Sequence, residues 1–274
     1  MQLNNKIAVV TGAAGVLCSQ FVEALLEDGA SVALLGRTES KLIKLKEAMA
    51  AKGFEKTFVV AADVLDEEAL KNVKEKINQE LGSIDILVNG AGGNKPGATS
   101  QAEQMTPETP ADQAFPSLDV NEFMQVFDLN FKGTLLPTQI FSQDMIAKQS
   151  GSIINISSVS AYLPLTKVAA YSSAKAAVEN FTKWLSTHLA PVNVRVNALV
   201  PGFFLTDQNR FLLTNEDGSK TARGQKIVDG TPMARYGESK ELKSAIRFLA
   251  CPDSSFVTGI SLPVDGGYTS YSGV

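Results

Sequence analysis

The 274-residue chain contains few of the side chains that bind metal ions or form cross-links. It has two cysteines, Cys18 and Cys251, and one histidine, His188. Two cysteines cannot form a disulfide framework, and together with one histidine they do not supply a zinc-ligand set. We therefore expect no metal site. The chemistry of this protein must use hydroxyl, amine or amide groups, or an organic cofactor.

An excess of charge of one sign and long apolar runs are also lacking. The chain has 25 basic and 29 acidic residues, a net charge of -4, and its basic residues do not gather in a tail. This balance argues against nucleic-acid binding through bulk electrostatics. No apolar run approaches the roughly 20 residues that a membrane-spanning helix needs. The N-terminal residues lead straight into a strand-like run, without the apolar segment of a secretory signal. We therefore expect a cytoplasmic protein with no nucleic-acid or membrane partner.

Strand-length apolar runs alternate with segments of helical periodicity along the whole chain. Hydrophobic residues make up 44% of the sequence, enough to bury a sizeable core. The predicted strands cover residues 7–11, 31–35, 57–61, 84–89, 152–157, 192–199 and 261–264. The predicted helices cover residues 16–27, 39–51, 66–81, 120–147, 169–189 and 239–250. We therefore predict an α/β fold, a Rossmann-like doubly wound parallel sheet of about seven strands with helices on both faces, formed by one domain over residues 1–274.

Two stretches interrupt this alternation. Residues 92–118 are rich in Gly, Pro, Thr and Gln, and residues 203–238 contain a turn-like segment at 215–218. Both follow the carboxyl ends of predicted strands, where open α/β sheets bind their ligands. Long loops in compact domains are usually functional, so we predict that these insertions cover the substrate. The alternative is that both are ordinary surface loops.

A turn of small residues joins the first predicted strand to the first helix. Small residues let the backbone approach a pyrophosphate, whose charge the N–H groups of the helix N-terminus then bind. We predict cofactor contacts from Thr11, Gly12, Ala14, Gly15, Val16 and Leu17. The run after the fourth strand would pack on the ribose side of the cofactor, with contacts from Asn89, Gly90, Ala91 and Gly92.

The end of the second strand bears on the choice between NADP and NAD. Gly36 stands where a dinucleotide-binding protein usually has a carboxylate, and Arg37 could pair with a 2′-phosphate, which favours NADP. Alternatively, Arg37 stacks on the adenine and the cofactor is NAD. Asp63 and Val64 follow the third strand and are predicted to contact the adenine. Asp63 could equally cap the next helix.

Four polar residues form a candidate catalytic set. Tyr171 and Lys175 are four residues apart in a predicted helix, which places both on one helix face. Such a pair also arises by chance and carries little weight alone. Ser158 follows the fifth strand 13 residues before the tyrosine, and Asn130 lies 41 residues before it.

Together with Thr11-Gly12, Asn89-Gly90-Ala91-Gly92, Pro201-Gly202 and Thr206, these residues resemble the short-chain dehydrogenase/reductase family over essentially the whole chain. The resemblance implies that Tyr171 is the general acid/base, and that Lys175 lowers the tyrosine pKa and holds the nicotinamide ribose. It implies that Ser158 polarises the substrate carbonyl and that Asn130 anchors a water in a proton relay. It further implies nicotinamide contacts from Pro201, Gly202, Phe204 and Thr206, and a homotetramer that uses helices 120–147 and 169–189.

The chain departs from the family pattern at two positions. Cys18 stands where the last glycine of the phosphate loop is expected, and Gly90 replaces a common asparagine. Other segments resemble the sugar-acid branch of the family, the D-mannonate oxidoreductases (fructuronate reductases): residues 15–19, 89–94, 128–139, 201–210, 215–219 and 271–274. That resemblance implies interconversion of D-fructuronate and D-mannonate. The alternatives are a gluconate 5-dehydrogenase-like or other polyol/keto reductase, and a catalytically silent nucleotide-sensing scaffold.

A sugar-acid substrate needs cationic and amide partners at the rim of the site. The predicted substrate residues are Asn94, Ser158, Lys167, Asn209 and Arg210, with Lys95 and Arg223 as further candidates. Apart from Ser158, each could instead be an ordinary solvated side chain. His188 is expected to be structural.

Overall fold

The computed structural model describes residues 2–205 and 210–273. Seven parallel strands in this part of the chain form one sheet, in the order β3-β2-β1-β4-β5-β6-β7. They are β1 (Ile7–Thr11), β2 (Ser31–Gly36), β3 (Thr57–Ala61), β4 (Ile86–Asn89), β5 (Gly151–Ile156), β6 (Val194–Pro201) and β7 (Ser261–Val264). The predicted Rossmann-like, doubly wound sheet is confirmed. The strand order reverses between β1 and β4, and folds of this type bind ligands at the carboxyl ends of such strands.

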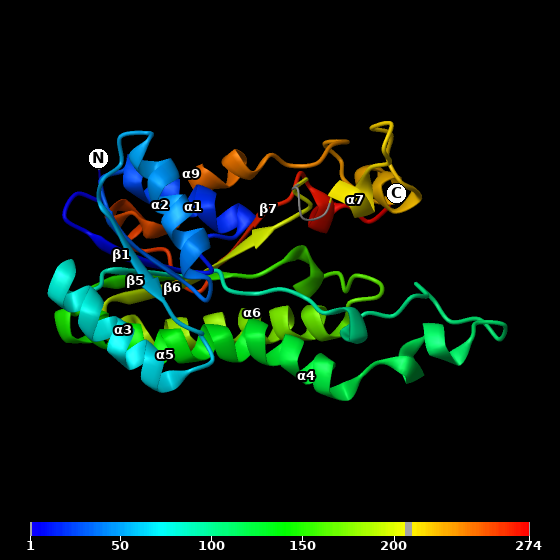
Figure 1. Ribbon diagram of the computed structural model, residues 1–274, viewed down its shortest axis with the longest axis horizontal. Coiled ribbons are helices and arrows are strands. Elements are labelled where there is room, and N and C mark those ends of the chain that lie inside the picture. The colour runs from blue at the N-terminus through cyan, green and yellow to red at the C-terminus, as the bar shows by residue number, and fades with distance from the viewer. Residues whose placement is uncertain (1, 206–209, 274) are drawn as a thin grey trace.

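Helices cover both faces of the sheet (Figure 1). One face carries α1 (Val16–Glu27), α2 (Glu39–Ala50) and α9 (Lys243–Ala250). The other face carries α3 (Glu67–Glu80), α4 (Val120–Phe127), α5 (Gly133–Lys148) and α6 (Ala169–Leu189). Two short helices, α7 (Arg210–Leu213) and α8 (Ala222–Asp229), belong to the second insertion. None of the helices in residues 2–205 and 210–273 combines the length and apolar content needed to cross a membrane.

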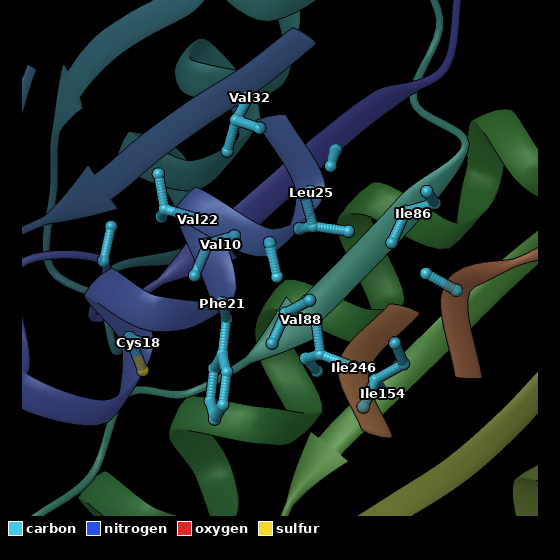
Figure 2. Packing of buried hydrophobic residues seen from close by; sticks show 14 of the residues in the cluster. Val10, Cys18, Phe21, Val22, Leu25, Val32, Ile86, Val88, Ile154 and Ile246 are labelled. Atoms are coloured by element: carbon cyan, nitrogen blue, oxygen red, sulfur yellow. The ribbon is translucent and has the colours of Figure 1, made fainter. Parts of the chain in front are cut away.

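The core consists of two apolar clusters, one on each side of the sheet. Successive residues of β1 alternate between them: Val10 packs with the cluster under α1 and α9, and Val9 with the cluster under α3, α5 and α6. Figure 2 shows the first cluster, in which Phe21 and Leu25 of α1 pack together with Val10 of β1 and Ile246 of α9. Because both faces of the strands are buried, they are apolar at almost every position, which made the strand pattern readable in the sequence.

The predicted helix over residues 120–147 is interrupted. α4 ends at Phe127, residues Asp128–Lys132 form a π-helical turn, and α5 begins at Gly133. The predicted helix over residues 239–250 likewise divides into a 3₁₀ turn, Ser239–Leu242, and α9. The first insertion contains three 3₁₀ turns: Pro96–Ala98, Ala111–Gln113 and Phe115–Ser117.

Candidate active site

The carboxyl end of β5 and the first turn of α6 bring Ser158 and Tyr171 together. Ser158 is buried and caps a short 3₁₀ turn, Val159–Ala161, by accepting a hydrogen bond from Ser160 N at 3.2 Å. Burial raises the pKa of the Tyr171 hydroxyl, and a hydrogen bond with the Ser158 side chain opposes that rise. The lowering contribution here comes from Ser158, and the influence of Lys175 that the family resemblance implies stays a prediction.

Lys175 lies one helical turn after Tyr171 and is 4% exposed. Its Nζ donates a hydrogen bond to the Ile156 carbonyl at 2.7 Å and lies 5.6 Å from the centroid of the Tyr171 ring. Burial lowers the pKa of the Lys175 ammonium to about 8, because a charged amine is poorly solvated there, while the charge of Glu179 opposes this shift. The ammonium is thus held at the end of β5, against the face of the tyrosine.

Asn130 lies in the π-helical turn and is fully buried. Its Nδ2 donates to the carbonyls of Gly93 and Val126, each at 2.8 Å, and its Oδ1 accepts from Gly93 N at 3.3 Å. A Cβ at Gly92 would lie 2.6 Å from Asn130 Oδ1 and 3.6 Å from Lys175 Nζ. Asn130 and Lys175 therefore flank the same glycine, where a side chain would not fit.

The turn after β1 forms a cradle of backbone groups. Thr11 Oγ1 accepts hydrogen bonds from Gly90 N at 3.0 Å and Ala91 N at 3.1 Å, which joins the two loops at the switch point. Within the described residues, α1 begins after Gly15 with no side-chain cap and no acidic residue in its first turn. The N–H groups of that turn are therefore open to an anion. These residues fit the pyrophosphate of a dinucleotide.

A cavity of about 320 Å³ lies between the cradle and the catalytic set. The predicted site residues that line it are Gly15, Val16, Leu17, Gly90, Gly92, Asn130, Tyr171, Lys175, Gly202 and Phe204. Four lining residues were not predicted as site residues: Cys18, Gly93, Ile156 and Phe203. Gly93 directly follows the predicted segment Asn89–Gly92, and Phe203 directly follows Pro201-Gly202, so both could have been predicted as neighbours of these motifs. Ile156 acts through its backbone carbonyl, which leaves no sequence signal.

Cys18 and Gly90 are in direct contact. The Cys18 sulfur donates to the Gly90 carbonyl at 3.6 Å, and a Cβ at position 90 would overlap that sulfur. Burial raises the pKa of the Cys18 thiol to about 12, so the group is neutral near pH 7. The two departures from the family pattern thus meet at one point of the cavity wall.

The other predicted cofactor residues within the described part of the chain do not line this cavity. Gly36 ends β2, and the exposed Arg37 follows it. Asp63 accepts a hydrogen bond from Leu65 N at 3.0 Å, and Val64 is buried. The remaining residues sit at the ends of strands or in the turns after them: Thr11, Gly12, Ala14, Ala91 and Pro201.

Asn89 lies inside the sheet. It is 1% exposed, and its Nδ2 donates to Thr138 Oγ1 and to Asn155 Oδ1, each at 2.8 Å. Asn155 is its register partner on β5 and in turn donates to Thr182 Oγ1 at 2.9 Å. This side chain therefore joins β4 to β5, α5 and α6 beneath the cavity.

The predicted substrate residues are spread over both insertions and the segment before α6. Asn94 is exposed and donates to Thr99 Oγ1 at 2.8 Å. Lys167 lines a second cavity, of about 400 Å³, beside the start of α6. Arg210 is exposed at the start of α7, whereas Thr206 and Asn209 lie outside the described residues.

His188 is exposed on α6, far along the helix from Tyr171. Its ring stacks on that of Trp184, with centroids 4.9 Å apart. It is absent from the residues that line the described cavity around Tyr171.

Comparisons with known proteins agree with this geometry. A family model, short chain dehydrogenase, matches residues 6–217. An uncharacterised oxidoreductase of Bacillus subtilis, UxuB, is 47% identical over 274 residues, covering 99% of this chain and 98% of that protein. A solved Haemophilus influenzae structure with bound NAD, provisionally named a D-mannonate oxidoreductase, is 44% identical with a TM-score of 0.95, covering 100% of this chain and 98% of its own. A gluconate 5-dehydrogenase from Burkholderia cenocepacia, in complex with NADP and tartrate, is 30% identical with a TM-score of 0.84, covering 98% and 97% of the two chains.

Proposed function

The chain belongs to the short-chain dehydrogenase family of NAD(P)-dependent oxidoreductases, and we propose that it interconverts D-mannonate and D-fructuronate. The observation that supports catalysis is that Tyr171, Lys175 and Asn130 line one cavity at the switch point of the sheet, while Ser158 is hydrogen-bonded to Tyr171. The observation that supports the substrate is the likeness to the Haemophilus influenzae protein, which is provisionally named a D-mannonate oxidoreductase. A protein that only bound nucleotides would not need this polar set.

The roles of the side chains follow from their positions. The bound nicotinamide supplies or accepts the hydride. In the oxidation direction Tyr171 takes the proton of the substrate hydroxyl, and in reduction it returns that proton to the oxygen. Ser158 donates a hydrogen bond to the same oxygen and favours the charge that develops on it. Lys175 holds its positive charge against the Tyr171 ring, and Asn130 orders the loop around Gly93 next to it.

Replacing Tyr171 tests the proposal. Tyr171→Phe removes the hydroxyl but keeps the ring, so we expect turnover of D-mannonate to fall by about 10²–10⁴-fold while NADPH or NADH binding persists. Turnover is followed by the absorbance of the reduced cofactor, and binding by its fluorescence. Tyr271→Phe, an exposed tyrosine near the C-terminus, serves as the control and should leave both unchanged. Undiminished turnover in Tyr171→Phe would refute the assigned role.

We also propose that the cofactor is NADP rather than NAD. Arg37 is exposed directly after Gly36 at the carboxyl end of β2, where a guanidinium can pair with a 2′-phosphate. Arg37→Ala should lower the ratio of kcat/KM for NADPH over NADH by about 10–100-fold, because a charge-assisted pair is lost. Lys41→Ala, an exposed cation on α2, is the control. A ratio that does not change would refute the pairing of Arg37 with a 2′-phosphate.

The proposal also covers the domain organisation, the oligomeric state and the location of the enzyme. We propose a single NAD(P)-binding domain whose insertions cover the substrate, a homotetramer, and a cytoplasmic location where the cofactor is recycled.

The second candidate function is that of a gluconate 5-dehydrogenase-like reductase, favoured by the likeness to the Burkholderia cenocepacia structure. Turnover of D-fructuronate, 5-ketogluconate and simple ketones separates the two. Cofactor binding without turnover of any carbonyl compound would instead indicate a silent scaffold.

A further inference from the structure

An acidic side chain of the first insertion joins two basic side chains of the second. Glu103 accepts a hydrogen bond from Lys226 Nζ at 2.8 Å, and Arg223 Nη1 lies 3.6 Å from its other oxygen. Both cations belong to α8, more than a hundred residues further along the chain. The two stretches that interrupt the strand–helix alternation therefore meet through these charges.

A third cation, Lys167, lies near the same carboxylate. The hydrogen bond and charge of Lys226 are the main causes that lower the pKa of the Glu103 carboxyl, and the charges of Arg223 and Lys167 add to them. Lys167 precedes Tyr171 by four residues and has φ +76°, a left-handed conformation that is uncommon for a residue with a side chain. Its carbonyl accepts a hydrogen bond from Ser100 N at 3.0 Å. Unusual backbone conformations of this kind concentrate at functional sites.

The charged cluster of Glu103, Lys167, Arg223 and Lys226 is linked to the lining of the catalytic cavity through Tyr268 and Phe203. Burial raises the pKa of the Tyr268 hydroxyl, and the positive charge of Arg223 opposes this rise. The Tyr268 ring packs edge-to-face on Phe203, with centroids 5.0 Å apart, and Phe203 lines the cavity with Tyr171. Lys167 belongs to the segment that leads into α6 and lines the second cavity there.

The charges in this cluster do not balance. Two cations pair with Glu103 and the charge of Lys167 also acts on it, so three positive charges face one carboxylate on a chain whose net charge is -4. The contact of Arg223 with Glu103 is the longer of the two ion pairs, and a guanidinium carries five N–H donors in a planar fork. Arg223 can therefore accommodate a second carboxylate in a bidentate pair.

We propose that Arg223, flanked by Lys167 and Lys226, binds the carboxylate of the substrate, and that Glu103 holds the three cations together across the two insertions. This inference rests on the proposed function, because it assigns the partner of the acid group in a sugar-acid substrate. Arg223 is then a specificity-determining residue, which selects an anionic over a neutral polyol and takes no part in hydride or proton transfer.

The test compares Arg223→Met and Arg223→Lys with a matched control, Lys71→Met. Lys71 also pairs with acidic residues, Glu67 and Glu68, but lies on α3. We expect Arg223→Met to raise the KM for D-mannonate by about 10–100-fold with little change in the KM for the cofactor, since a hydrogen-bonded charge pair is lost. Arg223→Lys should recover part of this loss, and Lys71→Met should match the wild type. Added salt should raise the KM of the wild type more than that of Arg223→Met.

Calorimetry of D-mannonate binding to the complex of each variant with reduced cofactor gives a readout independent of turnover, and thermal unfolding checks that each variant folds. Turnover of D-mannonate that Arg223→Met leaves unchanged, or an effect that Lys71→Met reproduces, overturns the cation site and leaves the proposed function standing. A wild-type protein that neither binds nor oxidises D-mannonate overturns both.

Discussion

The sulfur of Cys18 occupies the space that a side chain at position 90 would need. A Cβ at Gly90 would overlap this sulfur and would lie 2.9 Å from the Thr11 carbonyl. Each residue is unusual for the family when considered alone, and the contact explains why they occur together: the thiol fills the volume that the missing side chain vacates. Close packing makes such neighbours energetically dependent on each other.

A double-mutant cycle measures this dependence. Gly90→Ala should destabilise the fold by about 1–3 kcal/mol, because the new methyl group overpacks against Cys18. In Cys18→Ala the sulfur is absent, so Gly90→Ala should cost less there by about 0.5–3 kcal/mol. Urea unfolding gives the four free energies. Cys251→Ala, the other buried cysteine, is the control and should combine additively with Gly90→Ala. Additive effects for Cys18→Ala would contradict the coupling.

At the scale of elements, predictability follows the range of the interactions involved. β1, β3, β7, α1 and α6 begin and end where the sequence pattern predicted, because local periodicity reports burial on one or both faces. The break between α4 and α5 was not predicted, since residues 120–147 keep a helical pattern throughout. The π-helical turn is accompanied by hydrogen bonds from Asn130 to Gly93, 37 residues away, which a local pattern cannot reveal.

In the candidate site, too, some features follow from sequence patterns and others depend on contacts between distant segments. Motifs at strand ends could be placed at one edge of the sheet because parallel strands bring their carboxyl ends together, and the cavity contains Gly15, Gly92, Tyr171 and Lys175 as that rule predicts. Neither the pairing of Glu103 with Lys226 nor the burial of Asn89 could be predicted. The ion pair depends on how two long loops fold over the sheet. The burial of Asn89 depends on its hydrogen bonds to residues of neighbouring elements, such as Asn155 on β5.

At the scale of the whole molecule, large apolar side chains are exposed on both outer faces. Val120, Met124 and Trp184 lie on α4 and α6, in the helix layer on one side of the sheet. Phe248 lies on α9, in the layer on the opposite side. Exposed apolar groups of this size mark interaction sites, and two separate faces can each form a two-fold contact with another copy. Two different two-fold contacts generate a tetramer.

The proposed tetramer is tested by placing a charge on each face in turn. Sedimentation of the wild type should give four times the chain mass of 29.2 kDa. Trp184→Glu and Phe248→Glu should each give dimers, because a carboxylate buried at one contact is costly while the other contact persists, and the double variant should give monomers. Ile43→Glu, an exposed apolar position on α2, is the matched control and should remain tetrameric. A wild-type monomer at micromolar concentration would refute the assembly. Loss of both contacts from either single change would instead mean that the two faces form one interface.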